Sequence, residues 1–433
     1  MNDHDPAWGA GPAPGSPEAA RARMAADLMA SGRALSRPVR DAFARVPRHL
    51  FVPEVGGAAA YRDEAFVLKC GPDGVPLSSS SQPAMMAIML EQLELQPGHR
   101  VLEVGTGSGY NAAVMAAVTG PGGKVVSIDI DCELVERARS SLVAAGFGDV
   151  EVQCGDGGYG DPVGAPFDRI IVTAGAWDVA PAWLGQLTAD GRLVLPLSVC
   201  GIELSVALER TDDGWLSRSA CRCGFVRMLG DFARPQLALR IGGPDPVLVQ
   251  VADGGQIDAA ALRDALAGRA SDVRTGVQVY DHAELGDLDL WLTLTEPELT
   301  RLTVLSAVGR QPGHLLPLGG LAGHMADASS LGVAALLPAA SGAGRLGAGV
   351  TARGYGPGGE ALAAHLAARA LTWAELGRPG AAEVMLRVRP VPDAEFSPRA
   401  ETVAEQVRSE RGLVVVDRPS ASITIDWQRP AGR

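Results

Sequence analysis

The stretch from Val101 to Ile130 constrains this chain most, because it reads as a strand, a glycine-rich turn, a helix and a second strand. Three glycines follow the first apolar run at alternate positions, Gly105, Gly107 and Gly109. The second apolar run ends in Asp129, 20 positions after Gly109. In doubly wound folds such glycines let a ligand approach the backbone, and an acid at this distance binds an adenosine ribose. The stretch therefore predicts a nucleoside-cofactor site.

The spacing of the glycines favours S-adenosylmethionine (SAM) over a dinucleotide. Dinucleotide sites usually carry G-x-G-x-x-G, whereas this chain has G-x-G-x-G with Glu103 two residues before the first glycine. A carboxylate at that place would repel a pyrophosphate but suits the sulfonium and ammonium groups of SAM. NAD is the runner-up. A second acid, Asp156, lies between two glycines after the third predicted strand, where it can accept a hydrogen bond from an adenine amino group.

Composition narrows the class of protein. A chain of 433 residues suggests two or three domains, and 47% hydrophobic residues allow sizeable cores. A net charge of −12 argues against non-specific nucleic-acid binding. The six cysteines form no dense disulfide framework, and the Cys221/Cys223 pair lacks a second pair at zinc-finger spacing, so we expect no metal. The N-terminus lacks an apolar signal region and no apolar run is long enough to cross a bilayer, which predicts a cytoplasmic protein away from membranes.

The order of apolar and helical patterns predicts an α/β protein, with a doubly wound Rossmann-like sheet followed by a second α/β domain. We expect a disordered arm over 1–19, a cofactor-binding domain over 20–233 and an accessory domain over 234–433. Alternating strands and helices indicate a parallel sheet. The expected strands are 100–104, 124–129, 150–153, 168–173 and 192–196, and the expected helices are 17–31, 37–46, 83–95, 109–118, 131–145 and 179–188.

The remaining segments carry weaker patterns. Residues 61–82 are expected to be irregular, and 201–210 and 215–228 to be paired strands. In the second half, strands are expected at 247–253, 273–281, 288–297, 333–339 and 383–390, with helices at 258–268 and 359–376. The glycine-rich segment 342–359 is expected to be a flexible connector, since it lacks the residues of a phosphate-binding P-loop.

Six separated segments resemble protein-L-isoaspartate O-methyltransferases, and they occur in the order typical of that family. They are RVPRHLFVPE, AAAYRDEAF, the run from SSSSQP to NAAVMA, GDGGYG, APFDRIIVTAGA and GRLVLPL, and together they cover about residues 20–200. The resemblance implies a Rossmann-like class I methyltransferase that uses SAM. Its acceptor would be the free α-carboxylate of an isoaspartyl residue, or an aspartyl side chain, in a peptide or protein.

The resemblance also implies roles for particular residues. Ser81 takes the place of the family's active-site serine, although Ser79 and Ser80 replace its usual Thr-Ile, and Gln82 completes this substrate-binding segment. Asp129 with Ile130 would hold the ribose, and Asp156 with Gly157 the adenine. The residues implied at the methionine end of the cofactor are Glu103, Gly105, Thr106, Gly107, Ser108 and Gly109.

The second half leaves the biological role open. Segments 217–228 and 288–297 resemble an elongated branch of the family found with ribosomally made, modified (RiPP) peptides such as lanthipeptides and graspetides. On that resemblance, the enzyme tailors a precursor peptide by esterifying one aspartate, which then cyclises to succinimide (aspartimide), and the accessory domain binds the peptide. The alternative is a general repair enzyme for isoaspartyl proteins with an appended domain. A third hypothesis is a cofactor-binding regulatory or scaffold protein.

Overall fold

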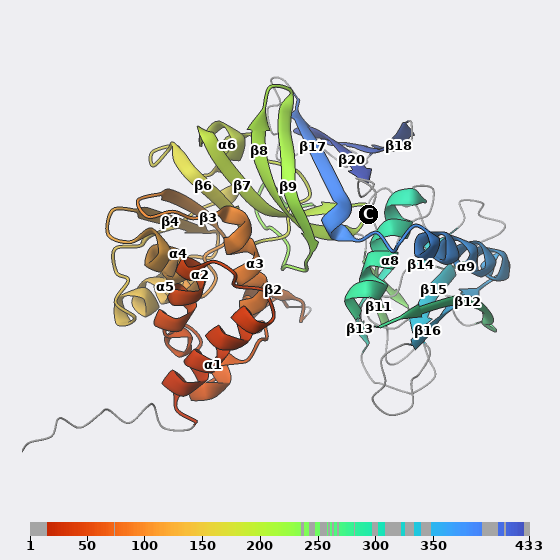
Figure 1. The fold of residues 1–433 in the computed structure, drawn as a ribbon, viewed down its shortest axis with the longest axis horizontal. Coiled ribbons are helices and arrows are strands. Elements are labelled where there is room, and N and C mark those ends of the chain that lie inside the picture. Colours follow the sequence, from red (N-terminus) through yellow and green to blue (C-terminus); the bar gives the residue numbers. More distant parts are fainter. Residues whose placement is uncertain are drawn as a thin grey trace, which may run out of the picture.

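The structure is a computed structural model, shown in Figure 1. It describes residues 15–72, 74–234, 238–241, 247–251, 258, 260–261, 264–265, 268–280, 282–296, 302–307, 322–324, 333–338, 348–391, 406–410 and 413–427. Most of the predicted arm over 1–19 lies outside these residues, but its last three residues already belong to the first helix. Within the described residues no helix is long and apolar enough to cross a membrane.

A helical cap precedes the main sheet. It consists of α1 (Pro17–Ala30), α2 (Arg37–Arg45), the short 3-10 helices η1 (Arg48–Leu50) and η2 (Gly57–Tyr61), and α3 (Pro83–Leu93). Ser16 caps α1 by accepting a hydrogen bond from the amide of Ala19, and a proline occupies the first turn of α1, α2 and α3. The prediction of an irregular stretch at 61–82 was wrong, because β1 (Phe66–Cys70) and β2 (Pro76–Ser80) pair there as an antiparallel hairpin.

The centre of the main sheet is parallel, as the alternating pattern predicts. Its strands are β3 (Arg100–Val104), β4 (Lys124–Asp129), β5 (Glu151–Cys154), β6 (Phe167–Val172) and β7 (Leu187–Val199). The connecting helices are α4 (Tyr110–Thr119), α5 (Cys132–Ala144), η3 (Gly157–Tyr159) and α6 (Pro181–Gly185). Successive residues of a strand face opposite sides, so Val101 packs in the core below the helical cap while Leu102 packs in the core on the other face.

The same sheet continues through antiparallel strands from both halves of the chain. Next to β7 come β8 (Ile202–Thr211) and β9 (Gly214–Arg222), and then β17 (Val384–Pro390), β20 (Ala421–Trp427), β19 (Leu413–Asp417) and β18 (Gln406–Glu410). Figure 1 shows β17, in blue, directly beside the green β9, with β20 on the other side of β17. One hydrophobic core joins them, since Leu386 and Ile423 belong to the same buried cluster as Leu102 and Leu193.

A smaller region packs α8 (His282–Thr295) and α9 (Gly359–Glu375) against a four-stranded antiparallel sheet. The strand order is β12 (Ser271–Val279), β16 (Ala348–Tyr355), β15 (Val333–Pro338) and β14 (Ala322–His324). A further sheet contains β10 (Ala238–Ile241), β11 (Val247–Val251) and β13 (Leu302–Ala307). Figure 1 places this region to one side of the main sheet, next to β17.

Two predictions for this smaller region were wrong. Segment 288–297 was expected to be a strand but belongs mainly to α8, because a continuous apolar run does not separate a buried helix from a buried strand. Segment 342–359 was expected to be a connector, yet it contains β16 and the first residue of α9, while 342–347 lie outside the described residues. Five of the eleven residues of the predicted helix at 258–268 also lie outside them.

The predicted division at residue 233 remains a prediction, and the structure bears on it in one respect. Strand β17 lies in the predicted accessory domain but pairs with β9 of the predicted cofactor-binding domain, where Val388 is opposite Trp215. The amide of Leu386 also donates a hydrogen bond to the Ser217 hydroxyl at 2.8 Å. The last strands of the chain are therefore built into the main sheet.

Candidate functional site

A pocket lies at the carboxyl ends of β3, β4 and β6. Parallel strands bring their carboxyl ends to one edge of a sheet, which is where open α/β folds bind ligands. The lining combines the serine segment, the glycine-rich turn, the end of β4 and a segment after β9. Of the residues implied by the sequence, those that line it are Ser79, Ser80, Ser81, Glu103, Gly105, Thr106, Gly107, Ser108, Asp129, Ile130 and Gly157. Gln82, Gly109 and Asp156 are not part of its lining.

The glycine-rich turn has a backbone that requires glycine. Gly105, Gly107 and Gly109 have φ of +103°, +53° and +83°, which L side chains rarely adopt. A Cβ at Gly105 would come within 2.5 Å of the Thr173 hydroxyl, and a Cβ at Gly107 within 3.1 Å of the Ser79 carbonyl oxygen. Gly109 caps α4 and packs against Ala138 instead of the pocket. The turn is therefore a close-packed cradle held between β6 and the serine segment.

Glu103 is the buried acid of the pocket, with no exposed surface. Its carboxylate accepts hydrogen bonds from Asn111 Nδ2 at 2.8 Å and from Ser127 Oγ at 2.6 Å, and Ser127 is also bonded to Thr106. Burial raises the pKa of Glu103 to about 7, and the two hydrogen bonds oppose the shift. A buried carboxylate in this state gains from a cationic ligand, which agrees with the reasoning that favoured SAM.

Asp129 ends β4 and faces the glycine-rich turn. Its two carboxylate oxygens accept hydrogen bonds from the amides of Gly107 at 2.9 Å and Asp131 at 3.0 Å. Burial raises the pKa of Asp129, and these amide bonds oppose the shift. The bond to Gly107 ties the ribose candidate to the cradle, so the two parts of the predicted cofactor site form one unit.

Asp156 caps the short helix η3. Its carboxylate accepts hydrogen bonds from the amides of Gly158 at 2.9 Å and Asp231 at 2.7 Å. The next residue, Gly157, lines the pocket, and a Cβ there would come within 2.4 Å of Val104 Cγ1. The role of Asp156 as adenine acceptor stays a prediction, and the structure gives its carboxylate a second task in holding the segment around Asp231.

The serine segment and the glycine-rich turn form neighbouring walls of the pocket. Ser79 and Ser80 end strand β2, and Ser81 precedes α3. The Ser108 hydroxyl of the glycine-rich turn donates to the Ser80 hydroxyl at 3.3 Å, so the two walls are in contact. Gln82 is exposed and donates to Asp63 at 2.9 Å. The structure therefore brings the serines to the cofactor candidates but directs the amide of Gln82 elsewhere.

Sequence reasoning missed the segment Phe225–Leu229, which closes the pocket. The carboxylate of Glu203 accepts a hydrogen bond from the amide of Phe225 at 2.8 Å, and the backbone around Arg227 is bonded on both sides to Gly175. Burial raises the pKa of Glu203 to about 7. Nothing in the local pattern marks these residues, because β9 and β6 bring them to the pocket only in the folded chain.

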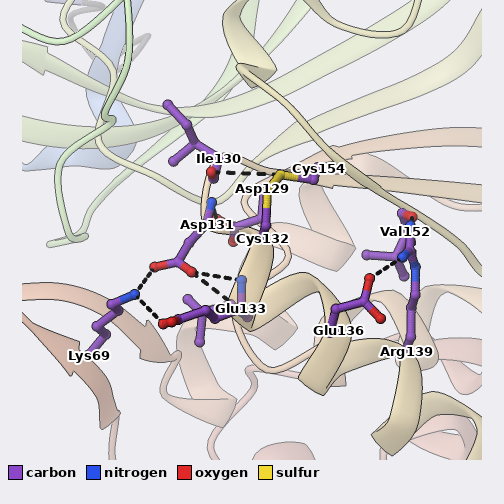
Figure 2. Close-up of a disulfide and its surroundings, with 11 residues drawn as sticks. Lys69, Asp129, Ile130, Asp131, Cys132, Glu133, Glu136, Arg139, Val152 and Cys154 are labelled. Carbon is purple, nitrogen blue, oxygen red and sulfur yellow. Dashed lines mark hydrogen bonds and ion pairs between the residues drawn. A yellow bond between two sulfur atoms is a disulfide. The ribbon is translucent and has the colours of Figure 1, made fainter.

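A disulfide links α5 to β5 next to the Asp129 side of the pocket. Cys132, the first residue of α5, is bonded to Cys154 at the end of β5, and Figure 2 shows it beside Asp129, Ile130 and Asp131. In the same view Lys69 of β1 reaches Asp131 at 2.5 Å and Glu133 at 2.8 Å. The hairpin that carries the serines is thus tied to the first turn of α5.

The described residues contain no group of three or more His, Cys, Asp or Glu side chains placed to hold a metal ion. Cys221 and Cys223 are free thiols, and burial raises the pKa of each. Thiols in this state are inert, which fits a structural role in β9 and the residues that follow it.

Comparison with known proteins identifies the family of this site. The family model described as protein-L-isoaspartate(D-aspartate) O-methyltransferase matches residues 19–231. A protein-L-isoaspartate O-methyltransferase of Methanopyrus kandleri is 41% identical over 221 residues, which cover 50% of this chain and 95% of the relative. A second such enzyme, from Archaeoglobus fulgidus, is 46% identical over 180 residues, or 42% of this chain and 79% of the relative.

Solved structures give a weaker likeness. A protein-L-isoaspartate O-methyltransferase aligns with a TM-score of 0.45 at 23% identity, covering 84% of this chain and 95% of the other. A putative enzyme of that type from Plasmodium falciparum, solved with S-adenosyl-L-homocysteine, has a TM-score of 0.43 at 19% identity and covers 48% of this chain and 98% of its own.

Proposed function

The chain belongs to the protein-L-isoaspartate(D-aspartate) O-methyltransferase family, whose members are SAM-dependent methyltransferases, and from this premise we propose that it esterifies isoaspartyl carboxylates in proteins and peptides generally. The observation that carries the proposal is the continuity of the serine segment with the glycine-rich turn in one pocket. The pocket thus joins a place for the acceptor to a place for the cofactor.

The residues fit SAM. The cradle leaves no room for a Cβ at Gly105 or Gly107, and acids line the pocket at Glu103, Asp129 and Asp131. SAM supplies an activated methyl group on a sulfonium, and this positive charge suits an acidic lining. Glu103 would face the charged methionine end, and Asp129 would hold the ribose. These assignments remain proposals.

The acceptor chemistry requires little proton transfer. A carboxylate is ionised at neutral pH and can act as the nucleophile without a general base. The protein therefore has to position the acceptor, and alignment of reacting groups can contribute about 7–11 kcal/mol to lowering the barrier. The Ser81 hydroxyl, at the end of the serine segment, would hold the carboxylate by a hydrogen bond. The nitrogen of a neighbouring backbone amide can then attack the ester carbonyl and displace methanol, which gives a succinimide.

Arg227 gives the acceptor side a positive charge. It lines the pocket on the segment that Glu203 and Gly175 anchor, and none of the ion pairs formed within the described part of the chain includes it. A guanidinium can bind a carboxylate through one or two hydrogen bonds. We place Arg227 at the acceptor, where it would attract an anionic peptide group toward the serine segment.

General methylation is favoured over peptide tailoring by the names of the relatives, which are protein-L-isoaspartate O-methyltransferases. The tailoring hypothesis rests on the resemblance of two segments. One of them, 288–297, lies mainly in α8, and the other forms the end of β9 and part of the pocket lining, so neither distinguishes a precursor peptide from other acceptors. The accessory region carries no assigned role in the proposed function.

The experiment compares three acceptors of identical sequence. They are a linear isoaspartyl peptide, its linear aspartyl isomer and a macrocyclic aspartyl peptide, each incubated with SAM carrying a labelled methyl group. We expect transfer to the isoaspartyl peptide with the highest kcat/KM. Transfer to the macrocycle alone would support tailoring, and transfer to none of them would favour a binding or scaffold role and overturn the proposal.

A further inference from the structure

The side chain of Arg48 is completely buried, yet its charge has no acidic partner among the described residues. Its guanidinium instead donates to backbone carbonyl oxygens, from Nη1 to Ala60 at 2.9 Å and Arg62 at 3.1 Å, and from Nη2 to Glu64 at 3.1 Å and Ser81 at 2.8 Å. Burial lowers the pKa of Arg48 to about 10, so it stays protonated at neutral pH. The protein therefore keeps a formal positive charge in its interior.

A charge in this place is costly for stability. Removing an ion from water carries a desolvation penalty on the order of several kcal/mol, which an apolar side chain of the same size would avoid. Two aromatic rings offset part of the penalty, because the guanidinium lies 4.8 Å from the ring centre of Phe66 and 5.6 Å from that of Tyr110. Its Nε remains buried without a hydrogen bond in the described structure. Packing alone does not explain why an arginine occupies this site.

The contacts of Arg48 connect two segments that meet beside the serine segment, where we place the acceptor carboxylate. One segment is 60–64, and the other is the end of the serine segment at Ser81. The first segment also holds α3, because Asp63 accepts hydrogen bonds from the Ala84 amide at 2.8 Å and from Gln82 Nε2 at 2.9 Å. Ser81 is thus fixed on its carbonyl side by Arg48, and the residues after it are fixed by Asp63.

We infer that Arg48 is a positioning residue for the acceptor carboxylate, which it serves by fixing the backbone at Ser81 and by placing an uncompensated positive charge behind the serine segment. The inference rests on the proposed function. The acids Glu103, Asp129 and Asp131 line the pocket where we place the cofactor, whereas Arg48 lies behind the serine segment and donates to the Ser81 carbonyl oxygen. The site is therefore polarised to take a cation at one end and an anion at the other.

The test measures how well the protein discriminates a charged acceptor from a neutral one. Wild-type, Arg48→Gln and Arg48→Lys proteins are titrated by calorimetry, in the presence of S-adenosylhomocysteine, with an isoaspartyl peptide and with the same peptide carrying a carboxamide in place of the carboxylate. We expect the wild type to bind the carboxylate peptide more tightly than the carboxamide peptide. In Arg48→Gln the ratio of the two dissociation constants should fall by about tenfold or more, the scale of one hydrogen bond to a charged group. Arg48→Lys, which keeps the charge but loses the fork of donors, should retain an intermediate preference and should fold if the glutamine variant does not.

Arg418 provides the matched control. It is also buried, donates to the Ser198 carbonyl oxygen and lies over Trp177. Neither arginine lines the pocket, but Arg48 donates to the carbonyl oxygen of Ser81, a lining residue, whereas Ser198 does not line the pocket. Arg418→Gln should lower the melting temperature without changing the carboxylate preference. Both Arg48 variants should bind S-adenosylhomocysteine within about twofold of wild type, since Arg48 contacts no cofactor candidate.

The outcomes separate the inference from the proposed function. If the wild type methylates the isoaspartyl peptide but the Arg48 variants keep its carboxylate preference, only the role of Arg48 is overturned. The same holds if Arg418→Gln loses as much preference as Arg48→Gln, because a general loss of packing would then explain both. If the wild type neither methylates nor prefers the carboxylate peptide, both the inference and the proposed function fail.

Discussion

The disulfide between Cys132 and Cys154 yields a prediction whose size follows from the fold. The bond closes a loop with a sequence separation of 22 residues, from the start of α5 to the end of β5. A covalent link stabilises a fold chiefly by reducing the entropy of the unfolded chain. For a loop of this length the loss amounts to about 3 kcal/mol at 25 °C. Replacing Cys132 by serine should lower the free energy of unfolding by that amount.

The assay is urea unfolding of wild type, Cys132→Ser and Cys70→Ser, each with and without a phosphine reductant. Cys70 is an exposed free thiol in β1 and serves as the control, so its replacement should leave stability nearly unchanged. Without reductant, Cys132→Ser should be about 3 kcal/mol less stable than wild type. With reductant the two should become equal, because neither then has the cross-link.

Two results would refute this reasoning. One is a wild-type unfolding curve that does not respond to reductant, and the other is a titration of six free thiols in the unreduced, unfolded protein instead of four. The second result would fit the cytoplasmic location that the sequence predicts, since reducing compartments keep thiols free. The measurement thus also tests that prediction about location.

Further predictions concern the pocket and the sheet. The pKa of Glu103 is raised from 4.5 in the unfolded chain to about 7 in the folded protein, so the folded protein binds more protons between these two pH values. The free energy of unfolding should therefore fall as pH rises from about 4.5 to 7. In urea unfolding, Glu103→Gln should flatten that dependence. Asp129→Ala should weaken S-adenosylhomocysteine binding by about 1.5–3 kcal/mol in calorimetry, and unchanged affinity would remove the ribose assignment. Ser81→Ala should lower kcat/KM for the isoaspartyl peptide by about 10- to 100-fold with cofactor affinity intact, whereas a large loss of affinity would place Ser81 at the cofactor. Leu386→Ala in β17 should destabilise the whole main sheet by about 2–5 kcal/mol. If the melting temperature of the predicted cofactor-binding domain stays unchanged in this variant, the accessory domain is independent of it.

The local pattern predicted the parallel centre of the sheet well. Several boundaries lie at residues that the sequence marks: β4 ends in Asp129, α4 begins after Gly109, and Asp131 caps α5. The cradle could be predicted for the same reason, because a positive φ at Gly105 or Gly107 demands glycine whatever the rest of the chain does.

The parts that were missed depend on contacts between distant segments. The β1–β2 hairpin has no alternating pattern strong enough to predict it. Helix α8 is apolar on several sides, and a short continuous apolar run does not distinguish such a helix from a buried strand. Strand β17 was expected, but its pairing with β9 was not, because the paired residues Val388 and Trp215 are far apart in the sequence. Arg48 was missed as a functional candidate because its carbonyl partners belong to segments that only the fold brings together.

The proposed function requires that an isoaspartyl carboxylate and SAM bind in the same pocket and that the methyl group pass from SAM to the carboxylate. Tandem mass spectrometry of an isoaspartyl peptide, incubated with this protein and SAM carrying a deuterated methyl group, tests it most directly. We expect a deuterated methyl ester on the α-carboxyl of the isoaspartyl residue, followed by its conversion to the succinimide. When Ser81 is replaced by alanine, we expect at least about tenfold less label at the same short reaction time. A label on any other group of the peptide, or an unmodified peptide with the wild-type protein, would contradict it.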